Sequence, residues 1–367
     1  MKVSYNLNAL NHNQTAEAIA ALGPVMTVLV EGEMGVGKTT LLYLLGKMFP
    51  TYTLIYCDCT VLDMGDVMVP MFDKITRSDN GEVSVVRFAI NEAMGMHIDG
   101  PCIVMLDELG KANPSVKAAL TRFMNEGVLG NVRKHEDTIV FATTNLGAEN
   151  VGDILQAHQL DRVIPVRLRK PDNLEWIEWG IDNDIDTSIL AWAKDTPEMF
   201  HSFEQYDNPT ENEYINHPKA KRKAFVTPRS LAKASDILKQ RDVLDDATVQ
   251  ALLCGAIGTF AANKLMAYVT LADQLPSIDS IKSDPNSAKV PTAPGAIMMV
   301  VYRALLTIER DWVVNWMTYM NRLSQEAQAV FVNNARKKDY SRQATVVNTK
   351  AFQDWCFTNG YVFSDDK

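Results

Sequence analysis

The chain has 367 residues, of which 47% are hydrophobic and 22% are charged. This composition is typical of a soluble globular protein and excludes a chain that is disordered, collagen-like or coiled-coil throughout. The formal net charge of −9 disfavours bulk electrostatic attraction to nucleic acid or to an anionic membrane. Residues 1–13 are polar and lack the apolar core of a signal peptide, so we expect a cytoplasmic protein. The most apolar stretch, residues 296–306, is too short to span a bilayer.

Short apolar runs and helical patterns alternate in the first half of the chain. The runs do not alternate between apolar and polar residues, which predicts parallel strands that are covered on both faces. Strands that alternate with helices predict a doubly wound α/β sheet between two helical layers. The predicted strands are residues 25–30, 53–57, 102–106, 138–143 and 163–166, and the predicted helices are residues 38–49, 115–126 and 152–160.

One stretch departs from this alternation. Residues 71–76 and 82–90 are β-prone and flank Ser78-Asp79-Asn80-Gly81. Because Asn-Gly between such runs is a strong hairpin signal, we predict a β-hairpin inserted between the second and third core strands. A plain surface loop stays open as the alternative.

The strand patterns stop after residue 170. Residues 231–238, 245–269 and 295–323, with a tail to 334, have helical patterns. The polar residues 195–224 resemble a linker or flexible loop, and residues 275–294 a second loop. The second half is therefore predicted to be helical.

A phosphate-binding motif follows the first predicted strand. Residues 32–39 (GEMGVGKT) match G-x-x-x-x-G-K-[ST] and open an apolar helix. Glycines let backbone N–H groups surround a phosphate, Lys38 neutralises the β- and γ-phosphates, and the Thr39 hydroxyl can bind Mg²⁺. We therefore predict that ATP is bound by Gly32, Glu33, Met34, Gly35, Val36, Gly37, Lys38, Thr39 and Thr40.

Two further strand ends carry polar residues. Asp107 and Glu108 follow the apolar residues 103–106, where Asp107 can lie beside Mg²⁺ and Glu108 beside the attacking water. Asn145 ends the next run, where its amide could orient that water or sense the γ-phosphate. Glu108 favours an ATP hydrolase over a P-loop kinase of small molecules, which needs no water-activating glutamate at this position.

The order of these motifs resembles AAA+ ATPases. Leu160-Asp161-Arg162 before a strand and Thr227-Pro228-Arg229 in a helical region complete the likeness. The inserted hairpin and the blocks at residues 106–112 (LDELGKA) and 124–129 (MNEGVL) look most like the MoxR branch. The resemblance covers residues 25–168 and one short motif at 226–239.

The resemblance implies a role for each matching residue. Lys38 and Thr39 correspond to the Walker A pair, and Asp107 and Glu108 to the Walker B pair, with Thr39 and Asp107 on Mg²⁺. The other implied roles are the first sensor for Asn145, the arginine finger for Arg162, with Arg167 and Arg169 as competitors, and the second sensor for Arg229. Gly110-Lys111 departs from the Asn-Arg that is usual in the MoxR branch.

The implied fold is a P-loop NTPase αβα domain of AAA+ type, with sheet order 5-1-4-3-2 and an inserted β-hairpin, followed by a helical lid and a helical C-terminal extension. We expect the nucleotide-binding domain at residues 1–170, the linker and lid at 171–270 and the extension at 271–367. The implied function is an ATP-driven motor or chaperone that forms a ring, with a hexamer expected, and remodels a partner protein. In the MoxR branch that partner often carries a von Willebrand factor A-type domain.

A DNA-processing AAA+ ATPase, such as a clamp loader or helicase loader, stays open as the alternative. The net charge of −9 and the lack of a basic or helix-turn-helix module argue against it. The basic cluster Lys219, Lys221, Arg222 and Lys223 could touch phosphate, but such short runs are usually solvated loops.

Cys57-Asp58-Cys59 resembles half of a metal site. No pair of Cys or His residues stands at ligand spacing from it, so we interpret it as part of a core strand.

Overall fold

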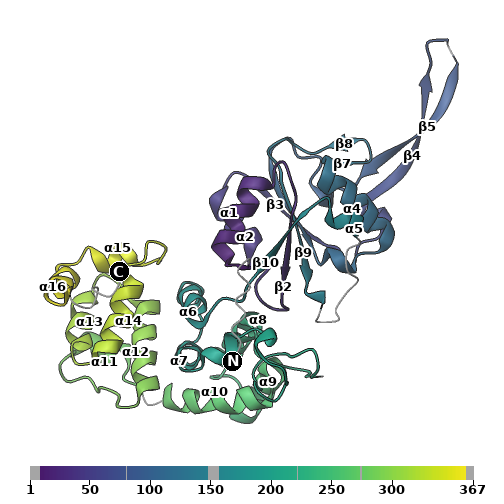
Figure 1. Ribbon diagram of the computed structural model, residues 1–367. Helices are drawn as coiled ribbons and strands as arrows, with labels where there is room; N and C mark the ends of the chain where they lie inside the picture. The colour runs from purple at the N-terminus through teal and green to yellow at the C-terminus, as the bar shows by residue number, and fades with distance from the viewer. Residues whose placement is uncertain (1–8, 80, 148–156, 221, 273–274, 361–367) are drawn as a thin grey trace. The chain divides into compact units, whose positions relative to one another are not determined.

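The computed structural model describes residues 9–79, 81–147, 157–220, 222–272 and 275–360 (Figure 1). The chain divides into two compact units, Met1–Lys170 and Pro171–Lys367. The first unit is built around a β-sheet, and the described part of the second is helical, as the sequence predicts. Among the described helices, none is long and apolar enough to cross a membrane.

Six parallel strands form the sheet of the first unit, in the order β1-β10-β2-β9-β6-β3. The last five are the five predicted strands, and their order is the 5-1-4-3-2 that the resemblance implies. The short edge strand β1 was not predicted. The bounds are β1 Ala9–Leu10, β2 Val28–Gly32, β3 Thr53–Asp58, β6 Cys102–Asp107, β9 Ile139–Asn145 and β10 Ile164–Leu168.

The register aligns the carboxyl ends of the central strands. Gly32, the last residue of β2, pairs with Asn145, the last residue of β9. On the other side of β9, strand β6 runs in register and ends at Asp107. The start of the glycine loop and the two predicted polar strand ends therefore meet at one edge, where open α/β sheets bind their ligands.

Helices cover both faces of this sheet (Figure 1). Successive strand residues point to opposite faces, so Met105 packs with α1 and α2 while Val104 packs with α4. Asn11 begins α1 with a capping box, and Asn113 caps α4 ahead of Pro114. The helices of this unit are α1 His12–Leu22, α2 Thr40–Met48, α3 Met64–Val67, α4 Pro114–Glu126 and α5 Ala157–Leu160.

The predicted hairpin is present as β4 Met68–Thr76 and β5 Glu82–Ile90, which pair antiparallel. It projects away from the rest of its unit (Figure 1). Asn80 of the predicted turn lies outside the described residues. A second, small hairpin joins β7 Val128–Leu129 to β8 Val132–Arg133.

The structure departs from the prediction near the start of the first unit. The first core strand begins at Val28 rather than at Val25, which is 81% exposed in a turn after α1. Helix α1 itself was not predicted. Of the helix predicted at residues 152–160, only Ala157–Leu160 lies within the described residues and is helical there.

The helices of the second unit share one apolar core. Helix α7 packs against both α10 and α12, so residues on either side of position 270 contribute to it. The division at residue 270 stays a prediction. The bounds are α6 Asn173–Asp182, α7 Thr187–Asp195, α8 Pro228–Leu238, α9 Asp246–Ile257, α10 Thr259–Ala272, α11 Ile278–Ser283, α12 Pro294–Thr307, α13 Val313–Met320, α14 Gln325–Ala335, α15 Gln343–Val347 and α16 Lys350–Thr358.

Two predicted long helices are each broken. The helix predicted at 245–269 breaks at Gly258, whose φ is +87°. A Cβ there would lie 2.8 Å from the backbone oxygen of Ala224, so the chain needs glycine to turn at this point. The helix predicted at 295–323 is interrupted after Thr307, where Ile308 becomes extended and starts a polar loop.

The segment 195–224 is not a flexible linker. Met199, Phe200 and Phe203 are buried, and the Arg222 guanidinium donates hydrogen bonds to the backbone oxygens of Pro209, Asn212 and Ile215 at 2.6–2.9 Å. Irregular backbone of this kind is stable because its polar groups have partners. In addition, α11 forms within the predicted loop at 275–294.

Trp316→Ala should destabilise the second unit by about 3–5 kcal/mol, because it empties a fully buried site beside Phe331. Urea unfolding followed by circular dichroism measures the effect. The control Val314→Ala removes a side chain that is 58% exposed on the same helix, and should change the free energy of unfolding by less than about 0.5 kcal/mol. Equal losses for the two variants would contradict the packing described.

Candidate active site

The glycine loop connects β2 to α2 at the carboxyl edge of the sheet. Gly35 and Gly37 have φ values of +69° and +99°, a region that favours glycine. A Cβ on Gly37 would lie 3.0 Å from Nε2 of His12, and this nitrogen is 3.1 Å from the backbone oxygen of Val36. Helix α2 starts directly after the loop, so the positive end of its dipole points toward it.

Lys38 is buried at the base of this loop, with 6% of its surface exposed. Its Nζ donates hydrogen bonds to the backbone oxygens of Gly32 and Glu33, at 2.9 and 3.2 Å, and to Oδ1 of Asn145 at 2.6 Å. The loop and the end of β9 are thus joined by a buried cation. Residues from two separate predicted motifs meet here.

Asp107 is buried at the end of β6. Its carboxylate accepts hydrogen bonds from the hydroxyl of Tyr56, at 2.8 Å, and from the hydroxyl of Thr143. Thr143 Oγ1 also accepts the backbone N–H of Glu108, at 3.2 Å. Tyr56 and Thr143 were missed from the sequence, although pairing β6 with β9 would have set Thr143 beside Asp107.

Glu108 adopts a left-handed backbone conformation, with φ 54° and ψ 39°. For a residue other than glycine this costs about 1–3 kcal/mol and requires compensating contacts. Its carboxylate accepts hydrogen bonds from Nδ2 of Asn145, at 2.8 and 2.9 Å, and forms an ion pair with Nζ of Lys111 at 2.5 Å. Asn145 therefore links Glu108 to Lys38. Lys111, which forms the ion pair, belongs to the Gly110-Lys111 pair that replaces the Asn-Arg usual in the MoxR branch.

The loop also contains a buried ion pair. Oε2 of Glu33 lies 2.9 Å from Nζ of Lys170, and the two side chains are 9% and 5% exposed. Lys170 follows β10 at the end of the first unit. No sequence signal pointed to this contact.

The three candidate arginines of the first unit are divided between two edges of the sheet. Arg162 precedes β10 and is exposed at the amino-terminal edge, opposite the glycine loop. Arg167 pairs in register with Glu31 near the carboxyl edge, and Arg169 follows on that side. Arg229 belongs to the second unit, where it is exposed in the first turn of α8.

Cys57 and Cys59, at the end of β3, are free cysteines that are buried. Burial raises the pKa of the Cys57 thiol to about 11, and burial together with the charge of neighbouring groups raises the pKa of Cys59 further. Thiolates, the metal-binding form, are therefore suppressed at neutral pH. No cluster of three or more His, Cys, Asp or Glu residues that could hold a metal occurs in the described parts of the chain.

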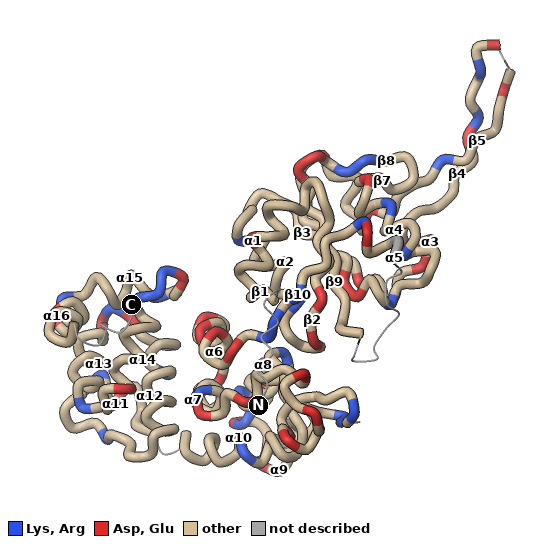
Figure 2. The backbone as a smooth tube through the Cα atoms, in the orientation of Figure 1, with Lys and Arg blue, Asp and Glu red and all other residues tan. Residues whose placement is uncertain are grey.

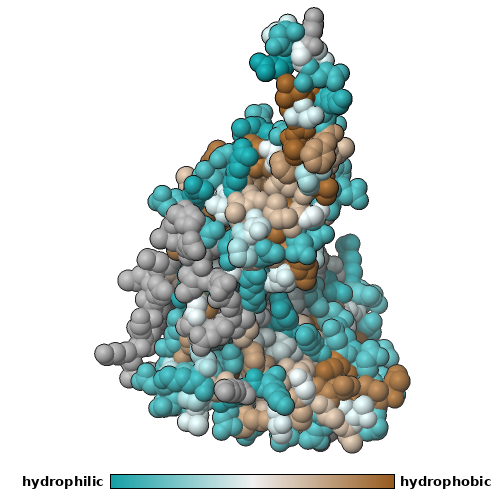
Figure 3. Space-filling model, turned by 90° about the vertical axis from the view of Figure 1, so that its right-hand side faces the viewer, coloured by the Kyte–Doolittle hydropathy of each residue, from teal (hydrophilic) through white to brown (hydrophobic). Residues whose placement is uncertain are grey.

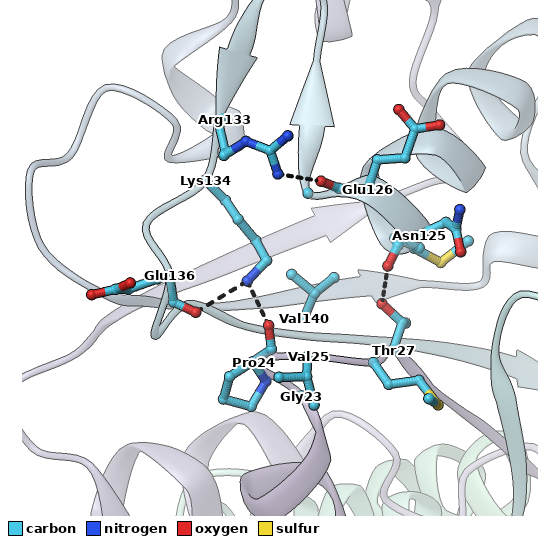
Figure 4. A pocket seen from close by; sticks show the side chains of 13 residues that line it. Gly23, Pro24, Val25, Thr27, Asn125, Glu126, Arg133, Lys134, Glu136 and Val140 are labelled. Carbon is cyan, nitrogen blue, oxygen red and sulfur yellow. Dashed lines mark hydrogen bonds between the residues drawn. The ribbon is translucent and has the colours of Figure 1, made fainter.

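A cavity of about 260 Å³ lies at the opposite end of β2, far from these residues (Figure 4). Its cations are already bound: Nζ of Lys134 donates to the backbone oxygens of Pro24 and Thr138 at 2.9 Å, and Arg133 donates to the backbone oxygen of Glu126 at 2.9 Å. Burial lowers the pKa of Lys134. These contacts stabilise the loop before β9 rather than presenting charge to a ligand.

Solved structures offer only distant likenesses, too weak to support an argument on function. Hsp104 with ATPγS and FITC casein is 18% identical, with a TM-score of 0.38 over 67% of this chain, which spans only 46% of that chain. The RuvB Holliday junction branch migration motor of Thermotoga maritima is 17% identical, with a TM-score of 0.33, covering 74% of this chain and 71% of that one. NtrX of Brucella abortus in complex with ADP is 12% identical, with a TM-score of 0.36, covering 96% and 68%.

No curated protein matches the sequence. Residues 28–168 match the family described as ATPase family associated with various cellular activities (AAA). The match runs from the start of β2 to the end of β10, so it includes five of the six strands of the sheet and the site residues of the first unit except Arg169 and Lys170. This part of the chain is similar to AAA-family domains and has the AAA+ P-loop NTPase fold, and a helical C-terminal part follows it.

Proposed function

We propose that this chain is an ATP-hydrolysing motor or chaperone of MoxR type that works as a ring and remodels a partner protein. The observation that carries the proposal is the chain of contacts Lys38–Asn145–Glu108 beside Asp107, at the carboxyl edge of an AAA-type sheet. It joins a phosphate-binding loop to a candidate general base.

The loop from Gly32 to Thr40 would hold the phosphates of ATP, with Lys38 neutralising the β- and γ-phosphates. The Thr39 hydroxyl and the Asp107 carboxylate supply oxygen ligands, which fit Mg²⁺. Mg²⁺ would neutralise the negative charge of the phosphates. Hydrogen bonds from Tyr56 and Thr143 fix the carboxylate of Asp107 in advance.

Glu108 would accept the proton of the attacking water. Its side chain is 22% exposed, so water can reach it, while Asn145 and Lys111 fix its direction. Because the amide of Asn145 contacts both Glu108 and Lys38, a ligand that draws Lys38 toward a γ-phosphate would also reorient the base. This arrangement supports the role of first sensor for Asn145.

Arg162 lies too far from the site of its own subunit to act there, since the length of β10 separates it from the loop edge. Its exposure at the opposite edge supports a role as the arginine finger of a neighbouring subunit in a ring, with a hexamer expected. We assign the second sensor to Arg229.

The hairpin supports a protein as the partner. Met71 and Phe72 are 56% and 84% exposed, and apolar side chains lie on the hairpin surface in Figure 3. Exposed apolar patches mark protein-interaction surfaces. A separate polypeptide with a von Willebrand factor A-type domain is the candidate that the MoxR likeness suggests.

The alternative of a DNA-processing ATPase has less support. Acidic and basic residues are interspersed over each unit (Figure 2), and the net charge is −9. Arg222 of the basic cluster is bound to backbone oxygens, while Lys221 lies outside the described residues. A steep fall of DNA affinity with salt would favour this alternative.

Lys38→Ala should abolish ATP binding, because it removes the buried cation of the loop. Titration with a fluorescent ATP analogue measures the affinity. Lys47→Ala removes an exposed lysine at the other end of α2 and should bind as the wild type does. Unchanged affinity in Lys38→Ala would contradict the loop assignment.

Glu108→Gln should bind ATP but hydrolyse it about 10²–10⁴-fold more slowly, because the amide cannot accept the proton of water. Phosphate release under single-turnover conditions measures the chemical step. Glu126→Gln, an exposed carboxylate of the same unit, serves as the control. Near-normal turnover in Glu108→Gln would show that another residue acts as the general base.

Arg162→Ala should bind ATP nearly normally and hydrolyse it about 10³-fold or more slowly. If Arg162 acts on a neighbouring subunit, a mixture of the Arg162→Ala and Lys38→Ala proteins should recover part of the ATPase activity. Some interfaces in the mixture then pair an intact nucleotide site with an intact arginine. The ring proposal would be contradicted if the two variants co-assemble and the mixture stays inactive. It would also be contradicted if the wild-type protein is active as a monomer.

A further inference from the structure

The glycine loop carries a carboxylate as well as its lysine. The Glu33 side chain is 9% exposed, and its backbone oxygen accepts a hydrogen bond from Nζ of Lys38 at 3.2 Å. Glu33 therefore lies next to the cation on which phosphate binding would depend. Its carboxylate is paired at 2.9 Å with Lys170, whose side chain is 5% exposed.

A negative charge at this place opposes the binding of a polyphosphate. Charges within a partly buried site interact through an effective dielectric constant of about 20 rather than that of water, so repulsion is weakened only in part. A triphosphate brings several negative charges to the loop. The ammonium group of Lys170 is the counter-charge of Glu33 in this ion pair, and both groups are largely shielded from solvent ions.

We infer that Lys170 neutralises Glu33 and thereby sets the affinity of the glycine loop for nucleoside triphosphates. This inference rests on the proposed ATP-binding function and adds a positioning residue that lies beyond β10 and acts through Glu33. Because repulsion by an unpaired Glu33 grows with the charge of the ligand, the pair matters more for ATP than for ADP.

The test measures ATP and ADP affinities of the full chain by calorimetric titration. Lys170→Met should weaken ATP binding about tenfold or more, and ADP binding less. Glu33→Gln should bind ATP at least as tightly as the wild type, and the double variant should regain wild-type affinity. Lys47→Met changes the net charge by the same amount at an exposed position of α2 and should have no effect.

The opposite signs of the two single variants separate this role from a structural one. If the pair only stabilised the fold, both single variants would lose thermal stability and ATP affinity together, which would overturn the inference. A double variant as weak as Lys170→Met would overturn it too, since Lys170 would then contact the nucleotide itself. If Lys170→Met binds ATP with wild-type affinity, only the inference about Lys170 is overturned. If the wild-type chain binds no ATP, the proposed function is overturned as well.

Discussion

The site is organised by the need of one buried ammonium group for hydrogen-bond acceptors. Lys38 finds them in the backbone of Gly32 and Glu33 and in the amide oxygen of Asn145. With its oxygen engaged by Lys38, the Asn145 amide must direct its NH₂ group elsewhere, and Glu108 accepts it. The glycine loop, the end of β9 and the carboxylate of Glu108 are therefore oriented by a single charge, and the strained backbone of Glu108 persists because its carboxylate is held.

Local patterns in the sequence were sufficient to predict the core of the first unit. Each of the five core strands is a continuous apolar run. Asp107 and Asn145 stand at strand ends and Lys38 lies in the loop that follows β2, so a parallel sheet brings them to one edge. The contacts of Tyr56 and the pairing of Glu33 with Lys170 depend on which strands are neighbours and on side-chain direction. No local pattern encodes those relations.

The errors in the second unit have a different cause. Helical periodicity continues through Gly258 and through residues 308–312, so the sequence favours long helices there. Tertiary packing ends the helix instead: at Gly258 the chain passes close to the backbone of Ala224, and with φ +87° this position has no room for a Cβ. The segment at 195–224 is polar in composition, yet three buried aromatic and sulfur-containing side chains, Met199, Phe200 and Phe203, anchor it. The overall polar composition of the segment therefore does not indicate that a few of its side chains are buried.

The strand order also governs when this domain can form during synthesis. Strand β2, which leads into the glycine loop, lies between β9 and β10, and these are the last two strands of the unit to be made. Such long-range pairings form slowly because large loops must close first. A nascent chain that has not reached residue 168 has the complete glycine motif but lacks one neighbour of its strand. The sheet around the glycine loop is therefore complete only once the carboxyl-terminal strand of the unit has been made.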